Sequence, residues 1–124
     1  MTVTSSMLVA LNLRTGAPLA DRARVTRGAW DRLRGLLGRP PLDSGEALLI
    51  RPCNGIHTVG MAYPIDVVFI DRVGRVIRAE RAVPPLRFIP LVRRAASVLE
   101  LPQGAIDASG TRCGDVLWFT EVEA

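Results

Sequence analysis

The sequence predicts an α+β domain built on an antiparallel, partly closed, barrel-like sheet of about seven short strands, with one short helix and a second helical turn. Three observations lead to this prediction. Short apolar or alternating segments recur between turn residues, which is typical of strands. A single stretch changes to helical spacing. The 124 residues suffice for one domain, 1–124, with its own core.

The first predicted elements form a hairpin. Residues 7–13 are an apolar run, and residues 14–18 contain turn residues. Residues 19–26 alternate apolar and polar side chains, which indicates a strand with one face in water. We therefore expect the two runs to pair with each other.

A helix is expected next. The spacing of apolar side chains changes to a helical period after Gly28. This predicts a helix over about 29–37, ended by Gly38 in a left-handed cap and by the prolines that follow. Its apolar face, and with it Trp30, is expected in the core. Trp118 near the end of the chain is also expected in the core, with the rim of a pocket as its alternative place.

The rest of the chain predicts further strands. Residues 65–70 are apolar apart from Asp66, and turn residues separate them from the alternating run 75–82, which predicts a second hairpin. Residues 83–90 contain three prolines and predict a loop or an extended edge connection. The remaining expected elements are strands over 47–50, 95–101 and 116–120, helical turns over 103–109 closed by Gly110, and a tight turn over 113–115.

Composition excludes several classes of protein. With 48% hydrophobic residues the chain does not belong to the disordered class. Two cysteines do not make a disulfide framework, and no apolar run approaches the roughly 20 residues that span a bilayer. The sequence therefore predicts a soluble, cytoplasmic protein without a membrane span.

The basic charge belongs to the first third of the chain. All sixteen basic residues are arginine, and residues 1–40 carry seven of them against two acids, whereas residues 41–124 carry nine against ten acids. A weak phosphate-binding or nucleic-acid-binding face is one hypothesis. The modest basic excess and the 5% of aromatic residues favour a solvated face instead. The arginines concerned are Arg22, Arg24, Arg27, Arg32 and Arg34.

The candidate site lies in residues 51–71, which contain the only histidine, the only tyrosine and one of the two cysteines. Gly55, Gly60 and Pro64 forbid a regular helix here, so the segment is expected to be a loop that leads into the strand 65–70. The residues expected to line a ligand site are Cys53, His57, Thr58, Met61 and Asp66.

Asp66 interrupts an otherwise apolar strand. A carboxylate buried there without a partner costs several kcal/mol, so arginine or loop amides must bond to it. It could anchor the 55–60 loop by accepting N–H groups, or it could contact a ligand. The two roles differ in whether Asp66→Ala lowers the melting temperature.

Two chemical hypotheses use the same residues. An imidazole near the thiol could lower the pKa of Cys53 and make it a nucleophile, with His57 as base and Asp66 as orienter, in a thiol-dependent hydrolase or transferase. A small core cysteine is the competing interpretation. Cys53, His57, Cys113 and Asp66 could also supply four zinc ligands, but no Cys-x-x-Cys or His-x-x-x-His pair is present, so neither a metal nor another cofactor is expected.

Three motifs in order resemble domain-of-unknown-function family 192. Residues 31–39, Asp-Arg-Leu-Arg-Gly-Leu-Leu-Gly-Arg, are similar to the family's first signature. Residues 56–71 resemble its second signature in the His-Thr form, and residues 98–104 with Gly114 and Asp115 resemble its closing pattern. The resemblance implies a compact mixed fold with a curved sheet and no agreed activity.

The sequence thus predicts a small binding or accessory module of unknown ligand, with its site at the central Cys-x-x-x-His loop and the following strand. A thiol enzyme and a weak phosphate or nucleic-acid binder are the alternatives. The partner would be a small molecule or a protein, with nucleic acid disfavoured, and the oligomeric state is open.

Overall fold

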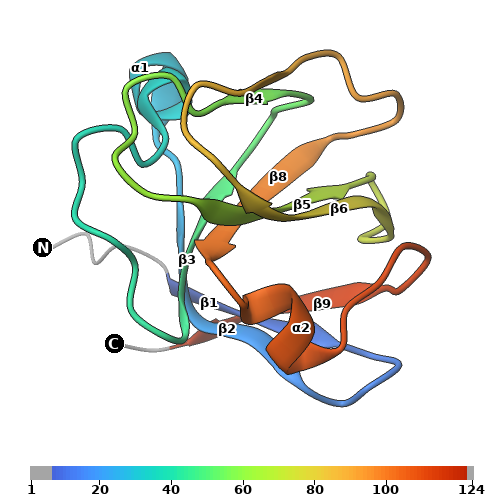
Figure 1. The fold of residues 1–124 in the computed structure, drawn as a ribbon. Coiled ribbons are helices and arrows are strands. Elements are labelled where there is room, and N and C mark those ends of the chain that lie inside the picture. Colours follow the sequence, from blue (N-terminus) through green and yellow to red (C-terminus); the bar gives the residue numbers. More distant parts are fainter. Residues whose placement is uncertain (1–6, 123–124) are drawn as a thin grey trace, which may run out of the picture.

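The computed structural model describes residues 7–122. Seven strands form one curled sheet in the order β6-β5-β8-β3-β2-β1-β9, and a two-stranded ribbon, β4-β7, lies apart from it (Figure 1). The elements are β1 (Met7–Asn12), β2 (Pro18–Val25), α1 (Gly28–Arg34), β3 (Glu46–Ile50), β4 (Ile56–His57), β5 (Ile65–Ile70), β6 (Val76–Val83), β7 (Phe88–Ile89), β8 (Ser97–Pro102), α2 (Ala105–Ser109) and β9 (Leu117–Val122).

The sheet-rich α+β architecture is confirmed, but the expectation of a purely antiparallel sheet is wrong. β2 and β3 pair in parallel, with Arg22 opposite Glu46 and Val25 opposite Leu49. A parallel pair needs a long crossover between its strands, and residues 26–45, which include α1, supply it. The other pairs in the sheet are antiparallel.

The barrel is not closed, because β6 and β9 remain the two edges of the sheet. The start of each edge strand nevertheless approaches the other at a bridge between Arg75 and Val116. The Val76 N–H donates to the Asp115 carbonyl at 2.7 Å, and the Leu117 N–H donates to the Gly74 carbonyl at 2.8 Å. The fold is therefore a half-barrel joined at one corner.

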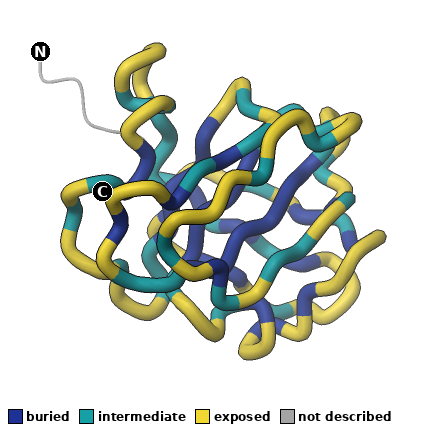
Figure 2. The backbone as a smooth tube through the Cα atoms, turned by 45° about the horizontal axis from the view of Figure 1, so that its top comes forward, coloured by how far each residue is buried: buried dark blue, intermediate teal, exposed yellow. Residues whose placement is uncertain are grey.

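Apolar side chains form one core on each face of the central strands. The inner core lies inside the curl and receives Ile106 of α2, whereas the outer core lies between the sheet and the three separate segments that carry α1, β4 and β7. Each residue of β5 is buried, because alternate side chains enter opposite cores. Figure 2 shows the buried stretches of chain gathered in the middle of the molecule, inside exposed loops.

The two predicted hairpins, β1-β2 and β5-β6, are confirmed. The helical turn closed by Gly110 is also confirmed as α2, where Gly110 has φ 67°. Both helices are short, and nowhere in residues 7–122 does a helix reach the length and apolarity needed to cross a membrane.

The predicted helix 29–37 ends earlier than expected. α1 stops at Arg34, and Gly35 follows with φ 53° and ψ −125°, a positive-φ conformation that glycine tolerates. Leu36 is buried, but the side chain of Trp30 is 75% exposed and that of Trp118 57%, so the expectation of two core tryptophans is wrong. Helical spacing identifies residues that share a face, but it does not show whether another element covers that face.

Candidate functional site

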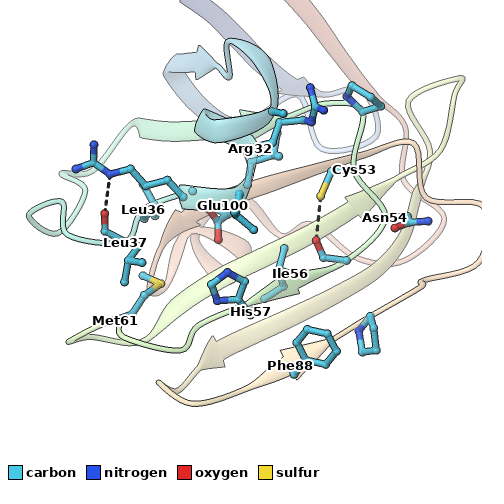
Figure 3. Close-up of a pocket in the computed structure, with 18 of the residues that line it drawn as sticks. Arg32, Leu36, Leu37, Cys53, Asn54, Ile56, His57, Met61, Phe88 and Glu100 are labelled. Carbon is cyan, nitrogen blue, oxygen red and sulfur yellow. Dashed lines mark hydrogen bonds between the residues drawn. The ribbon is translucent and has the colours of Figure 1, made fainter.

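A cavity of about 430 Å³ opens on the outer side of the sheet, between the end of α1 and the segment that includes β4 (Figure 3). Most of its wall is apolar, from Leu36, Ile50, Ile56 and Met61 in the outer core to Phe88 and Leu91 at the surface. The polar side chains that line it are Arg32, Arg34, Cys53, Asn54, His57 and Glu100.

Glu100 supplies the most buried polar group of the cavity. It lies on β8 between Leu48 of β3 and Val67 of β5, and only 2% of its surface is exposed. Its neighbour Leu99 points into the inner core, so the strand alternation sends Glu100 outward into the cavity. Its Oε1 atom has no hydrogen-bond partner in the protein.

Gly35 makes room for this carboxyl group. A Cβ atom built on Gly35 would lie 2.8 Å from Glu100 Oε1, closer than such a contact allows. The same glycine ends α1 with its positive φ. Because Gly35 has no side chain, it can adopt the conformation that ends α1 and it leaves space for the Glu100 carboxyl group.

Burial changes the acid–base chemistry of Glu100. Desolvation disfavours the charged form and raises the pKa of the Glu100 carboxyl to about 7. The group is thus poised near neutral pH between a carboxylate that accepts hydrogen bonds and an acid that also donates one. Such a group in a cleft is a functional-site candidate.

His57 lies in β4, which holds it in register with Phe88 of β7. Its Nδ1 atom is buried and has no hydrogen-bond partner in the protein. Figure 3 shows the His57 ring and the Glu100 carboxyl group both directed into the cavity. Within residues 7–122, Nδ1 and Glu100 Oε1 are the buried side-chain polar atoms without a partner, and both belong to this cavity.

Cys53 lines the same cavity, and its surroundings favour the neutral thiol. Its thiol donates to the Gly55 carbonyl at 2.9 Å, and burial raises the pKa of the Cys53 thiol. A nucleophilic cysteine needs the opposite shift. Met61 also lines the cavity and is buried in the outer core.

Asp66 and Thr58 are not among the residues that line the cavity. Asp66 accepts the N–H groups of Ala82, Gly104 and Ile106, at 2.9, 3.1 and 2.9 Å. Loop amides are therefore its partners, although they belong to the end of β6 and the start of α2 rather than to the 55–60 loop.

Thr58 is fully buried and connects two segments of backbone. Its hydroxyl donates to the Pro84 carbonyl at 2.7 Å and accepts the Arg87 N–H at 2.9 Å. The structure thus brings Cys53, His57 and Met61 to one cavity and gives Asp66 and Thr58 backbone partners elsewhere.

Several of the N-terminal arginines have partners within the protein. Arg24 forms an ion pair with Asp31 at 2.8 Å, and Arg22 bonds to Asp21 at 3.2 Å. Arg34 donates to the Leu37 carbonyl at 3.0 Å. Arg32 lines the cavity and is half-buried.

In the described part of the chain, histidine, cysteine and acidic side chains do not gather in groups of three or more that could hold a metal ion. The second cysteine, Cys113, is exposed in the turn before β9, where its thiol approaches the Ile77 carbonyl at 3.4 Å.

Glu100 and Gly35 are the site residues that sequence reasoning missed. The signal for Glu100 was the one used for Asp66, a carboxylate inside an apolar run, here Val98-Leu99-Glu100-Leu101. Gly35 lies inside the predicted helix, where a glycine is unfavourable and so needs a reason.

Comparisons with known proteins agree on the fold and give no activity. The family model DUF192, described as "Uncharacterized ACR", matches residues 11–119. A protein of unknown function from Novosphingobium aromaticivorans has a similar structure, with a TM-score of 0.77 and 19% identity over 90% of this chain and 83% of that one. A candidate transcription regulator from Sinorhizobium meliloti gives a TM-score of 0.80 and 18% identity over 96% of each chain. At these identities the likeness concerns the fold alone. No curated protein matches the chain.

Proposed function

The chain belongs to domain-of-unknown-function family 192, and we propose that it is a binding module. Its cavity takes a small molecule with an apolar body and a polar head. Cys53, His57, Met61 and Glu100 line the proposed site.

The single observation that carries this proposal is the pair of unpartnered polar atoms in one apolar cavity, Glu100 Oε1 and His57 Nδ1. Leaving a buried polar atom unbonded costs about 1–3 kcal/mol, and native proteins retain few such atoms. A ligand that bonds to both atoms removes that cost. The volume of about 430 Å³ lies within the range of small-molecule sites.

The thiol enzyme is less well supported by the same geometry. Burial raises the pKa of the Cys53 thiol, which donates to a carbonyl rather than to His57. Asp66, the expected orienter, bonds to backbone amides outside the cavity.

Nucleic-acid binding also has weaker support. One structural neighbour is named as a candidate transcription regulator, but the likeness to it lies in the fold. In this chain Arg22 and Arg24 are paired with carboxylates, which reduces the charge that they can offer to phosphates.

Binding at the cavity can be tested with an uncharged two-ring probe, 2-naphthalenemethanol, by following amide NMR shifts of the full chain. We expect shifts to concentrate at residues that line the cavity. Leu33→Trp should weaken binding at least fivefold, because Leu33 lies at the cavity wall on α1 with 62% exposure and a larger side chain there obstructs entry.

Leu13→Trp is the matched control. Leu13 is also an exposed leucine, at 52%, but it lies in the turn after β1 and does not line the cavity. Binding should be unchanged in this variant. Equal weakening by both substitutions would remove the proposal, as would the absence of shifts at millimolar concentrations of this probe and of its charged analogues.

A further inference from the structure

We infer that the cavity binds an apolar primary amine whose ammonium group donates to the Glu100 carboxylate while its hydrocarbon body fills the space beside it. This inference rests on the binding role proposed above and names the class of ligand. No part of it uses Cys53 as a reactive group.

The position of Glu100 is fixed from several sides. Leu48 and Val67 flank it on the neighbouring strands, and Gly35 approaches so closely that a Cβ atom there would lie 2.8 Å from Oε1. In this position Oε1 receives no hydrogen bond from the protein. A ligand in the cavity can bring the donor to it.

The charge of the missing partner follows from the charge of Glu100. An anionic head would meet a carboxylate in a poorly hydrated site, where like charges repel strongly. An uncharged head would leave the ionised carboxylate without a counter-charge. A primary ammonium supplies both a counter-charge and three N–H donors. His57 Nδ1 offers a second acceptor for the same head when the ring proton is on Nε2.

The other titratable groups around Glu100 come from each element that packs on it. They are Arg32 and Arg34 of α1, Cys53 and His57 of the central segment, and Tyr63, whose hydroxyl pKa is raised by burial and by the charge of Glu100. The flanking residues of β3 and β5 are apolar. Arg34 is exposed and bonds to the Leu37 carbonyl, so water and salt screen its repulsion of a cation.

Amine binding should depend on pH, because burial raises the pKa of the Glu100 carboxyl to about 7 and the ammonium pairs with the ionised form. An aliphatic amine stays protonated well above that pH. The ionised fraction of Glu100 grows about 30-fold between pH 5.5 and pH 8, so amine affinity should rise by about the same factor.

The experiment compares three probes with the same ring system on the full chain: 2-naphthylmethylamine, 2-naphthalenemethanol and 2-naphthoate. Dissociation constants come from amide NMR titrations at pH 5.5 and pH 8. At pH 8 the amine should bind at least tenfold more tightly than the alcohol, and the naphthoate more weakly than either. The amine should lose about 30-fold in affinity at pH 5.5, whereas the alcohol should change little.

Glu100→Gln keeps the shape of the side chain and removes its charge. Amine affinity in this variant should fall to that of the alcohol, and its dependence on pH should disappear. Glu80→Gln is the matched control, because Glu80 lies on β6, pairs with the exposed Arg78 and does not line the cavity. The pH series on the unmodified chain tests the inference even if Glu100→Gln fails to fold.

The outcomes separate the inference from the proposed function. Equal affinity for amine and alcohol at pH 8, a flat pH dependence for the amine, or tighter binding of naphthoate would overturn the amine and leave a cavity that binds other small molecules. Failure of all three probes to shift the cavity amides would overturn both proposals.

Discussion

Two carboxylates lie inside apolar strands of this protein, and their surroundings differ completely. Asp66 of β5 points to the inner side of the sheet and accepts three backbone N–H groups. Glu100 of β8 points to the outer side and meets apolar side chains and a cavity. Asp66 is therefore bonded as a structural anchor, whereas Glu100 is a buried acid whose Oε1 atom has no hydrogen-bond partner in the protein.

Glu100 should destabilise the unliganded protein at neutral and alkaline pH. Its folded-state pKa of about 7 lies above the ordinary 4.5, so the unfolded chain releases this proton first as pH rises. Stability is therefore lost between about pH 4.5 and 7 and stays low above. Glu100→Gln should raise the free energy of unfolding at pH 8 by roughly 3 kcal/mol and change it little at pH 4.5.

Urea unfolding of both proteins at the two pH values measures this difference. Glu80→Gln, which changes a partly exposed glutamate that pairs with Arg78, should show no comparable gain at pH 8. An equal gain for Glu100→Gln at both pH values would mean that ionisation of Glu100 is not its cause.

Asp66 should behave as an anchor. Asp66→Ala leaves three N–H groups without their acceptor at the junction of β6 and α2, and each costs about 1 kcal/mol or more, so the free energy of unfolding should fall by roughly 3 kcal/mol. Asp107→Ala, at an exposed ion pair with Arg81, should stay within about 0.5 kcal/mol. Urea unfolding gives both values. Normal stability with loss of probe binding would instead assign Asp66 to the ligand site.

At the scale of elements, the end of α1 and the floor of the cavity depend on the same glycine. Gly35→Ala should cost about 1 kcal/mol for its positive φ and more for the contact with Glu100, so roughly 2 kcal/mol in all. Gly38→Ala is the comparison for a positive φ without a close carboxyl group, because Gly38 has φ 73° and its Cβ would meet only the flexible end of Arg34 at 3.7 Å.

A double-mutant cycle shows whether Glu100 is the cause. In a Glu100→Ala background the cost of Gly35→Ala should fall to that of Gly38→Ala, as measured by urea unfolding. An undiminished cost in that background would show that the carboxyl group does not limit the space at residue 35.

Elements marked by an apolar run or by a clear period could be predicted from the sequence, and those with neither could not. The hairpins β1-β2 and β5-β6 each follow from an apolar run and an alternating run that turn residues separate. β4 and β7 have two residues each, which is too short for a period, so the ribbon that carries His57 was not foreseen. The parallel pairing of β2 with β3 depends on how a crossover returns across the sheet, and no local pattern encodes that.

The candidate site could be predicted only in part, because one of its residues comes from a distant strand. Cys53 and His57 were identified as rare residue types in a loop, Met61 was expected beside them, and all three line one cavity. Glu100 comes from a strand about forty residues further along the chain, so its place beside them depends on the order of strands in the sheet. Which face of a strand a carboxylate occupies is likewise decided by register, as the opposite orientations of Asp66 and Glu100 illustrate.

At the scale of the whole molecule, the open half-barrel needs a connection between its two edges, and Asp115 organises that corner. Its carboxylate accepts from Asn12 and Arg14 at the end of β1 and from the Arg112 N–H, while its carbonyl accepts from Val76 at the start of β6. Arg14 and these other donors hold the pKa of the Asp115 carboxyl well below its usual range. The ionised side chain therefore fixes the turn before β9 to the end of β1 and the residues that follow it, and the backbone carbonyl of the same residue bonds to the start of β6.

Protonation of Asp115 should make the protein less stable in acid. Its effect on stability therefore changes with pH in the opposite direction to that of Glu100. Because the folded pKa of Asp115 is depressed, its stabilisation is fully present above about pH 4 and is lost as pH falls further. Asp115→Asn should lower the melting temperature clearly at pH 7, and its difference from the unmodified chain should shrink by pH 2.5. Asp107→Asn, at an exposed pair, should show little effect at either pH. Melting curves from pH 2.5 to 8 measure the effects of Asp115 and Glu100 together. The melting temperature should rise from acid pH to about pH 4.5 and decline toward pH 7. Asp115→Asn should flatten the rise, and Glu100→Gln should flatten the decline. If the difference between Asp115→Asn and the unmodified chain stays constant across the acid range, uncharged hydrogen bonds stabilise the corner instead.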